Sequence, residues 1–597
     1  MASRIEDYAL IGDLQTAALV GRDGSIDWLC VPRFDSGACF AELLGTEDHG
    51  RWLLAPVAEP RAVRRRYRDG TLVLETSFET DEGAVTVIDW MPVRTDVPDL
   101  VRMAVGRRGR VRMRTEIEIR FDYGSIVPWV QRTDGAWSAV AGPDAVYLAS
   151  DVDLHGRGFS SVGEFTLAEG ERAAFVMAWH PSNRPPPPVP DAQVSLEETE
   201  AWWRGWSGGG RYRGEWAEAV NRSLITLKAL TYAPTGGIVA AATTSLPTWI
   251  GGVRNWDYRY CWVRDATFTL LALLACGYED EARAWRDWLL RAVAGRPEEM
   301  QIMYGPAGER RLTEIELDWL PGYEGSRPVR VGNAAHAQRQ LDVYGEAMDA
   351  LYQARRSGLA HEERAWHVAE ALLRHLDSAW RQPDQGIWEV RGPNGHFIYS
   401  KVMAWVAFDR AVRMVEEFRL EGPVDRWRSL RDAIHDEVCR EGYAPDIGSF
   451  VQSYGSKRLD ASLLMIPLVG FLPPSDPRVR GTVEAVERHL MRDGLVYRYD
   501  TAETPDGLPP GEGAFLVCSF WLADCYHLLG RTDDARRLFQ RLLELRNDVG
   551  LLSEQYDPEG RRMLGNFPQA FSHVGLVGTA TNLTTAAGPA QRRTKGA

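Results

Sequence analysis

A run of four consecutive prolines, residues 185–188, divides the chain into two parts whose hydrophobic residues repeat with different periods. With Asn183 and Arg184 before it and Val189 and Pro190 after it, this run must be extended and cannot pair as a central strand. A short acidic helix over residues 195–206 and three glycines at 208–210 follow. We therefore expect a Pro-rich linker with a short helix over residues 183–213, between two domains of different class.

The part before the linker, residues 1–182, has the pattern of antiparallel β structure. Residues 62–80 contain an Asp69-Gly70 turn between two alternating runs, which is typical of a β-hairpin. Further strand-like runs, separated by glycine and aspartate, lie at residues 84–92, 101–106, 111–121 and 173–179. Their spacing favours an N-terminal antiparallel β-sandwich domain over βαβ units.

The part after the linker, residues 214–585, has the 3.6-residue period of amphipathic helices. About twelve helical segments are expected, at residues 214–233, 262–277, 279–294, 334–357, 361–381, 399–419, 423–441, 458–470, 478–491, 511–530, 532–547 and 568–584. They share no repeated sequence unit, which argues against a TPR or HEAT solenoid. Six pairs closed into an (α/α)6 toroid, with long loops around a central pit, fit this number. Residues 586–597 are expected to form a disordered tail.

Composition excludes several classes of protein. The net charge of −14 argues against a nucleic-acid partner, and no apolar run approaches the roughly 20 residues of a membrane-spanning helix. The seven cysteines form no CxxC pair and the start lacks a secretory signal, which predicts a reduced, cytoplasmic protein. The 12 histidines include no HExxH pattern, so we expect no catalytic metal and no cofactor. The sequence leaves open whether copies of the chain form a homo-oligomer.

Three loop segments crowd polar and aromatic residues together without helical spacing. The first, residues 255–265, ends in Arg264 and Asp265 at the start of an apolar helix. One interpretation is structural: Asp265 caps the helix and Arg264 pairs with it. The other is a sugar site, in which aromatic rings flank the sugar face and the Arg–Asp pair binds hydroxyl groups.

The second segment, residues 385–392, places Glu389 between Trp388 and Val390. A carboxyl group beside apolar surface is poorly solvated when ionised, which favours the protonated form that a general acid needs. The third segment, residues 551–558 with 566–573, places Glu554 among Ser, Gln and Tyr, an environment expected to favour the ionised form. Taken alone, each glutamate fits better as an exposed acid of a turn or loop.

Together the two glutamates indicate glycoside hydrolysis, which uses a pair of carboxyl groups. An inverting enzyme separates them by about 6.5–9.5 Å to admit a water molecule, and a retaining enzyme by about 5–5.5 Å. The sequence does not measure this separation. His396 and His573 lie close along the chain to the two carboxylate segments and are further candidates for contact with substrate.

Long motifs outside these segments point to a family. Residues 5–13 (IEDYALIGD), 23–30 (DGSIDWLC), 325–335 (GSRPVRVGNAA) and 340–346 (QLDVYGE) resemble bacterial members of glycoside hydrolase family 15, the glucoamylase and bacterial trehalase family. The resemblance covers nearly the whole chain. It implies an inverting enzyme that releases β-glucose from a small-molecule α-glucoside, with Glu389 as general acid and Glu554 as general base.

The resemblance also implies a set of residues around the sugar. Trp262, Arg264 and Asp265 match the segment that grips the non-reducing glucose, and Tyr258 matches a tyrosine near the reacting carbon. Trp388 and Arg391, which flank the acid, complete the expected substrate-binding set together with His396 and His573.

One position departs from the glucoamylase pattern. Glucoamylases have a second glutamate directly after the acid that helps to hold the leaving-group sugar, whereas Val390 stands there in this chain. Because no starch-binding module follows the helices either, we expect trehalose as the substrate, with isomaltose or maltooligosaccharides as alternatives. A disaccharide phosphorylase, which would need no base glutamate, and a non-catalytic sugar-binding protein are the remaining alternatives.

Overall fold

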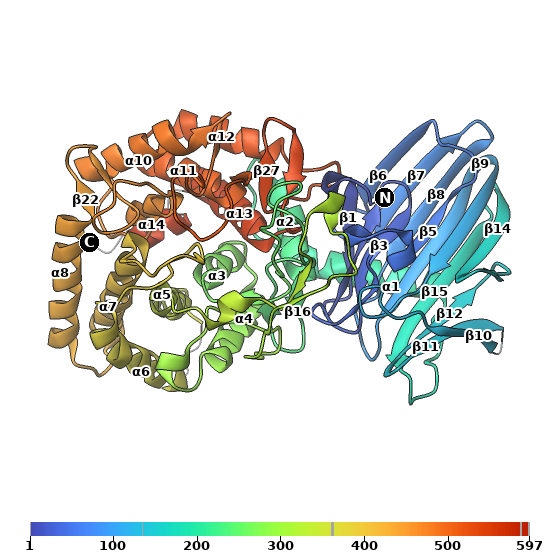
Figure 1. Ribbon diagram of the computed structural model, residues 1–597, viewed down its shortest axis with the longest axis horizontal. Helices are drawn as coiled ribbons and strands as arrows, with labels where there is room; N and C mark the ends of the chain where they lie inside the picture. Colours follow the sequence, from blue (N-terminus) through green and yellow to red (C-terminus); the bar gives the residue numbers. More distant parts are fainter. Residues whose placement is uncertain (1, 134, 360–362, 586–587, 595–597) are drawn as a thin grey trace.

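The computed structural model describes residues 2–133, 135–359, 363–585 and 588–594. As the sequence predicts, the N-terminal part is an antiparallel sheet domain and the C-terminal part is helical (Figure 1). The sheet domain contains β1 (Tyr8–Gly12), β2 (Ala17–Gly21), β3 (Ser25–Cys30), β4 (Ala38–Phe40), β5 (Arg51–Pro56), β6 (Ala62–Tyr67), β7 (Leu74–Thr80), β8 (Gly83–Trp90), β9 (Asp99–Glu118), β10 (Trp129–Thr133), β11 (Ala136–Ala141), β12 (Asp144–Ser150), β13 (His155–Arg157), β14 (Ser160–Ala168) and β15 (Arg172–Pro181).

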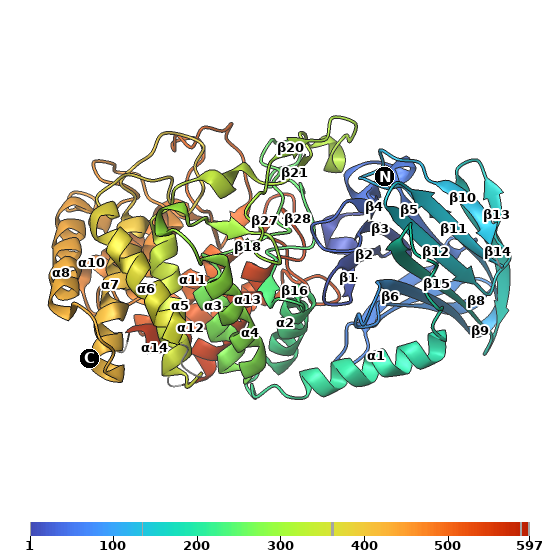
Figure 2. The same ribbon diagram turned by 90° about the horizontal axis from the view of Figure 1, so that it is seen from below.

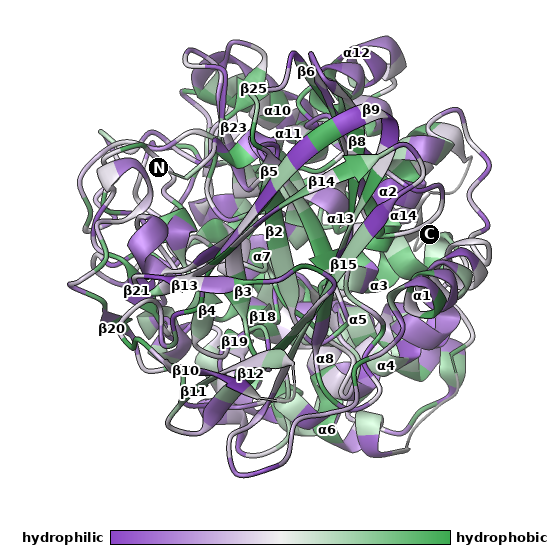
Figure 3. Cartoon of the chain, turned by 90° about the vertical axis from the view of Figure 1, so that its right-hand side faces the viewer, coloured by the Kyte–Doolittle hydropathy of each residue, from purple (hydrophilic) through white to green (hydrophobic). Residues whose placement is uncertain are grey.

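One long strand, β9, joins two groups of strands. It pairs through residues 99–109 with β8 and β15, and through residues 110–118 with β5 and β14. The predicted strands 101–106 and 111–121 are thus a single strand, because the intervening arginines and glycine stay extended. Hydrophilic and hydrophobic stretches alternate along it (Figure 3). The predicted hairpin at residues 62–80 is confirmed as β6 and β7.

The helix after the prolines covers the sheet domain. It runs from Ala192 to Ser207 as α1, and the Asp191 side chain accepts hydrogen bonds from the N–H groups of Gln193 and Val194 at its start. Trp90 of β8 donates to the hydroxyl of Ser195 at 3.1 Å. The linker region therefore packs as part of this domain before the chain crosses to the helices (Figure 2).

The helical domain contains α2 (Ala217–Ala229), α3 (Ala266–Ala275), α4 (Glu279–Ala292), α5 (Asp342–Arg356), α6 (Glu363–Ala379), α7 (Ile398–Phe418), α8 (Val424–Glu441), α9 (Met465–Leu468), α10 (Pro477–Leu490), α11 (Leu516–Leu528), α12 (Thr532–Leu543), α13 (Ala570–Thr584) and α14 (Pro589–Thr594). Short strand pairs lie between them: β16 (Thr231–Tyr232) with β17 (Gly237–Ile238), β18 (Cys261–Trp262) with β19 (Met303–Tyr304), β20 (Ile315–Glu316) with β21 (Arg330–Val331), β22 (Tyr443–Ala444) with β23 (Ser449–Phe450), β24 (Met491–Arg492) with β25 (Leu495–Val496), and β26 (Ala514–Phe515), β27 (Gln555–Asp557) and β28 (Arg562–Leu564) together.

Six of these helices contact one another in a closed series. The helix α3 packs against α5, which is followed by α7, α9, α11 and α13, and α13 returns to α3. Outside the series, α8 packs on α7 and α2 packs on α13, whereas α4, α6 and α12 each contact two neighbouring members of the series. The helix α10 packs on the 3₁₀ turn that precedes α9. The far end of this arrangement holds α14, and the loops between helices gather at the opposite end (Figures 1 and 2).

Two predicted helices and the predicted tail differ from the structure. The helix predicted at 334–357 begins only at Asp342, after a separate 3₁₀ turn at Ala334–Ala337, and the one predicted at 458–470 is a 3₁₀ turn followed by the short α9. The tail expected to be disordered contains α14, because Arg593 forms an ion pair with Asp349 at 2.6 Å inside the domain. Residues 586–587 and 595–597 of that tail lie outside the described residues.

The two domains share a buried polar interface. Trp28 of β3 donates to the carbonyl of Ala242 at 2.8 Å, and Asn547 donates to the carbonyl of Tyr8 at 2.8 Å. Arg259, only 1 % exposed, donates to the carbonyl of Ser36 at 2.9 Å. The sheet domain thus contacts the segment that includes Tyr258. Within the described part of the chain, no helix combines the length and the apolar character needed to cross a membrane.

Candidate active site

The first predicted segment forms a short strand and the start of α3. Trp262 lies in β18, and Arg264 and Asp265 follow directly before Ala266 begins the helix. The Asp265 side chain makes no capping hydrogen bond, so the capping interpretation is wrong. Arg264 does pair with it, with Nε donating to Oδ1 at 2.8 Å. Both side chains are about one-tenth exposed, which leaves the pair accessible at one edge.

Glu389 lies at the end of a turn, with its N–H donating to the carbonyl of Gly386 and a left-handed backbone (φ 56°). Its Oε1 accepts a hydrogen bond from Trp262 Nε1 at 2.7 Å and one from Arg264 Nη1 at 3.4 Å. A non-glycine residue with this φ is uncommon outside sites where the surrounding structure fixes it. The structure thus brings the candidate acid together with two of the predicted sugar-binding residues.

Glu554 directly precedes β27 and is 1 % exposed. Its Oε1 accepts from the Tyr258 hydroxyl at 2.8 Å, and its Oε2 accepts from the N–H of Asn566 at 3.3 Å. Burial raises the pKa of Glu554 to about 7, although Arg498 and these hydrogen bonds act in the opposite direction. The expectation of an environment that favours the ionised form is therefore wrong, because the fold removes from water a carboxyl group whose chain neighbours are polar.

Two aromatic residues connect the carboxyl groups. The rings of Tyr258 and Trp262 meet edge to face with centroids 5.1 Å apart. Since Tyr258 donates to Glu554 and Trp262 donates to Glu389, three successive contacts lead from one glutamate to the other. Both acids therefore border the same group of side chains, although they are far apart in the sequence.

Trp388 and Arg391 lie on either side of the candidate acid but have different surroundings. The Trp388 indole donates to Asp460 Oδ2 at 3.0 Å, and its ring contacts that of Phe515. The Arg391 side chain is 26 % exposed and pairs with Glu314 at 3.3 Å. Trp388 thus supports the turn from inside, and Arg391 reaches the solvent-exposed rim.

The two predicted histidines are not brought to this group. The His573 ring is fully buried, with one nitrogen accepting from the N–H of Leu552 at 3.2 Å and the other contacting the Ser223 hydroxyl at 3.0 Å. Burial lowers the pKa of His573 to about 3, so it is neutral and structural. His396 stacks on Tyr454 and contacts neither glutamate. The prediction of substrate contact for these two residues is not supported.

The sequence analysis missed Arg498. This arginine, whose side chain is 12 % exposed, pairs with Glu512, and its guanidinium lies 5.6 Å from the centroid of the Trp388 ring. Its positive charge lowers the pKa of Glu554 relative to burial alone. Arg498 lies between Tyr497 and Tyr499, so the criterion that selected residues 255–265, polar and aromatic residues without helical spacing, would also have found it.

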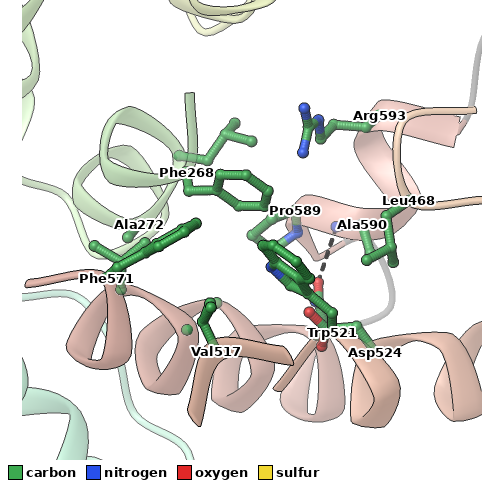
Figure 4. Close-up of a pocket in the computed structure, with 15 residues that line it drawn as sticks. Phe268, Ala272, Leu468, Val517, Trp521, Asp524, Phe571, Pro589, Ala590 and Arg593 are labelled. Atoms are coloured by element: carbon green, nitrogen blue, oxygen red, sulfur yellow. Dashed lines mark hydrogen bonds between the residues drawn. The ribbon is translucent and has the colours of Figure 1, made fainter. Parts of the chain in front are cut away.

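An apolar cavity of about 40 Å³ lies beneath the site (Figure 4). Phe268, Phe571 and Trp521 converge there beside Pro589 and Ala590 of α14, and none of the predicted site residues lines it. Phe571 also lies under Arg264, 5.3 Å from its guanidinium, and Trp521 contacts Trp388. These rings form a floor for the site. Across the described ranges, no group of three His, Cys, Asp or Glu side chains is arranged to hold a metal ion.

Known proteins are similar to this chain in sequence and in fold. Trehalase of Mycobacterium tuberculosis is 37% identical over 614 residues, covering 98% of this chain and 90% of the relative. Trehalase of Thermoplasma volcanium is 33% identical, covering 98% of this chain and 94% of the relative. A bacterial glucoamylase complexed with acarbose superimposes with a TM-score of 0.72 at 12% identity, over 100% of this chain and 97% of that one, which shows a shared fold.

Two family descriptions match successive parts of the chain. "Trehalase-like, N-terminal" matches residues 1–152, within the sheet domain. "Glycosyl hydrolases family 15" matches residues 214–581, which include all the helices from α2 to α12 and most of α13. Since this second match covers more than half of the chain, the chain belongs to glycosyl hydrolases family 15.

Proposed function

We propose that this glycoside hydrolase is an inverting, exo-acting α-glucosidase that hydrolyses trehalose and releases β-glucose from the attacked half of the substrate. The observation that carries the proposal is the path of contacts from Glu389 through Trp262 and Tyr258 to Glu554. The relatives named trehalases support the choice of substrate. At the position of Val390 glucoamylases have a glutamate, and this difference supports a leaving-group site unlike theirs.

In this proposal Glu389 is the general acid. Both of its neighbouring donors reach Oε1, so Oε2 is the oxygen that carries the proton. As the bond between the anomeric carbon and the glycosidic oxygen breaks, that proton passes to the oxygen of the departing glucose. Arg264 and Asp265 hold the glucose that stays behind, with the paired charges fixing donors and acceptors for its hydroxyl groups.

Glu554 is the general base. It takes a proton from a water molecule while the water oxygen bonds to the anomeric carbon from the face opposite the departing group. A base works best when its pKa lies near the working pH, and the pKa of Glu554 is about 7. The proposal requires the two carboxyl groups to be about 6.5–9.5 Å apart, so that this water fits between them and the configuration is inverted.

The test compares Glu389→Gln and Glu554→Gln with the unchanged protein on trehalose. We expect kcat to fall by at least about 10²–10⁴-fold in each variant, because each loses a proton-transfer group. Glu346→Gln is the matched control: Glu346 is another buried glutamate that accepts from a tyrosine, Tyr399, but it contacts neither catalytic candidate. Near-normal turnover by either of the first two variants would refute the assignment.

A substrate panel separates the proposal from its alternatives. Trehalose, maltose, isomaltose and nigerose are incubated with the enzyme, and the released anomer is followed by NMR. We expect trehalose to be preferred and to yield α- and β-glucose in equal amounts before mutarotation, because the departing glucose keeps its α configuration and only the attacked glucose is inverted. Release of α-glucose alone from trehalose would contradict inversion, and product formation that requires stoichiometric phosphate would instead identify a phosphorylase.

We also infer the finer architecture from the contacts described above. The closed series of six helices with six partners supports an (α/α)6 toroid, and the two strand groups joined by β9 support a β-sandwich. Domain limits at residues 182 and 214 agree with the ends of β15 and the start of α2. A cytoplasmic location stays a prediction, with which seven free cysteines are compatible.

A further inference from the structure

We propose that Trp256, Arg391 and Glu314 form the binding site for the departing glucose and set the preference for a disaccharide. This inference rests on the proposed function, because it assigns the part of the substrate that the acid releases. It concerns a cluster at the rim of the site that the mechanism above does not use.

The cluster lies between the acid and the base. Arg391 follows Glu389 by two residues, and Gln338 Nε2 fixes this stretch by donating to the carbonyls of Glu389 and Val390 at 3.1 and 3.2 Å. On the other side, the Trp256 carbonyl accepts from Asn566 Nδ2 at 2.9 Å. The N–H of the same asparagine donates to Glu554. A group that leaves from between the two glutamates therefore passes this cluster.

Two arginines stack on the indole of Trp256. The guanidinium of Arg391 lies 4.5 Å from the ring centroid and that of Arg330 lies 4.6 Å from it. Glu314 pairs with both, with Arg391 at 3.3 Å and with Arg330 at 3.6 Å. These contacts hold the two guanidinium groups and the ring in a fixed arrangement before any ligand binds.

The two arginines differ in the number of N–H groups that have no acceptor within the described residues. Arg330 donates to the carbonyls of Val253 and Asn255 and pairs with Glu316 as well, and its side chain is 11 % exposed. Arg391 has one protein acceptor among the described residues, Glu314, and is 26 % exposed. Arg330 is therefore structural, whereas Arg391 presents unused N–H groups to a ligand at the rim.

These properties fit a glucose unit better than a long glucan. A guanidinium with free donors binds vicinal hydroxyl groups. The Trp256 ring, on which the Arg391 guanidinium stacks, holds those donors in place. Val390, at the position next to the acid, has no polar side-chain atom and is 5 % exposed. Polar recognition of the departing sugar is thus moved by one residue, from the position of Val390 to Arg391.

The experiment compares two substrates that share the retained glucose but differ in the departing group. Trehalose releases glucose, and α-glucosyl fluoride releases fluoride, which needs no sugar-binding site. In Arg391→Ala we expect kcat/KM for trehalose to fall about 10–100-fold, the effect of losing hydrogen bonds from a charged group. The ratio of kcat/KM for trehalose to that for the fluoride should fall at least tenfold. Arg391→Lys, which keeps the positive charge but loses the planar guanidinium with its paired N–H donors, should give an intermediate ratio.

The chain offers a matched control. Arg536 lies 5.1 Å from the centroid of the Trp216 ring and pairs with Glu215 at 2.6 Å, the same combination on the outer helix α12. Arg536→Ala should leave the ratio unchanged. An equal loss on both substrates in Arg391→Ala and Arg391→Lys would overturn the inference while leaving the proposed function intact. If the unchanged protein hydrolyses the fluoride but not trehalose, the proposed function fails first and the inference with it.

Discussion

The hydroxyl of Tyr258 donates a hydrogen bond to Glu554. This hydrogen bond lowers the pKa of Glu554 and so increases the fraction of the base that is ionised at neutral pH. Since burial raises the pKa of Glu554 to about 7, we expect kcat/KM of the unchanged protein to fall as the pH drops through about 7. In Tyr258→Phe the donor is lost, so the pKa of Glu554 rises further and this acidic limb moves to higher pH. A pH profile of kcat/KM from 5 to 9 measures the shift.

The control for this prediction is Tyr454→Phe, which removes a phenol that contacts Glu437 and His396 away from the site. Its profile should match that of the unchanged protein. A flat profile down to pH 5 in the unchanged protein would show that Glu554 is not the group that must lose its proton.

Single residues were predictable from the sequence where local crowding marks them. Glu389 and Arg264 come from segments that mix aromatic and polar residues, and the structure brings them together. Tyr258 was predicted from the family resemblance, and it contacts Glu554. The surroundings of Glu554 were not predictable, because the groups that bury and hydrogen-bond it come from segments distant along the chain. His573 shows the converse, since closeness along the chain did not bring it to the site.

Among the elements, the short helix α14 contributes one partner of a buried ion pair. Arg593 and Arg410 both pair with Asp349, which is fully buried, and although burial alone would raise the pKa of Asp349, the two arginines hold it well below its usual range. Removing one partner of a buried pair costs about 3–5 kcal/mol. Because Arg410 stays in place, we expect Arg593→Met to cost about 3 kcal/mol, at the lower end of that range.

Urea unfolding followed by tryptophan fluorescence measures this cost as a lower midpoint. Asp349→Asn combined with Arg593→Met completes a double-mutant cycle, in which the two changes should not be additive. The exposed pair of Arg536 with Glu215 provides the control, and Arg536→Met should not move the midpoint. Strict additivity in the cycle would show that the ion pair does not stabilise the fold.

Most helices were predictable to within a few residues, because the outer ones, such as α4 and α12, present one apolar stripe with a 3.6-residue period and the inner ones, such as α11 and α13, are long apolar segments. Failures occurred where tertiary contacts override that period. Residues 334–341 have helical composition, yet Asn333, Gln338 and Gln340 hold them in a 3₁₀ turn and an extended stretch beside the acid. The tail could not be placed from sequence, since its order depends on Asp349 of α5.

For the molecule as a whole, the buried bonds between domains predict cooperative unfolding. Trp28 and Asn547 join the sheet domain to the helices, and Arg259 connects it to the segment that holds Tyr258. We expect differential scanning calorimetry to show one endotherm, with activity lost over the same temperature range. Two separate endotherms, with activity following only the second, would show that the sheet domain does not support the site.

The floor of aromatic rings beneath Arg264 limits how substrate and products enter and leave the site. Phe268, Phe571 and Trp521, backed by α14, close the far end, and the space left there, about 40 Å³, admits a few water molecules but no hexose. Among the described residues, this end therefore leaves no passage wide enough for a sugar chain, and we expect substrate and products to pass through the opposite end, where the loops gather. The retained glucose lies deepest in the site, so it can leave only after the departing glucose has left. The two products are therefore released in a fixed order.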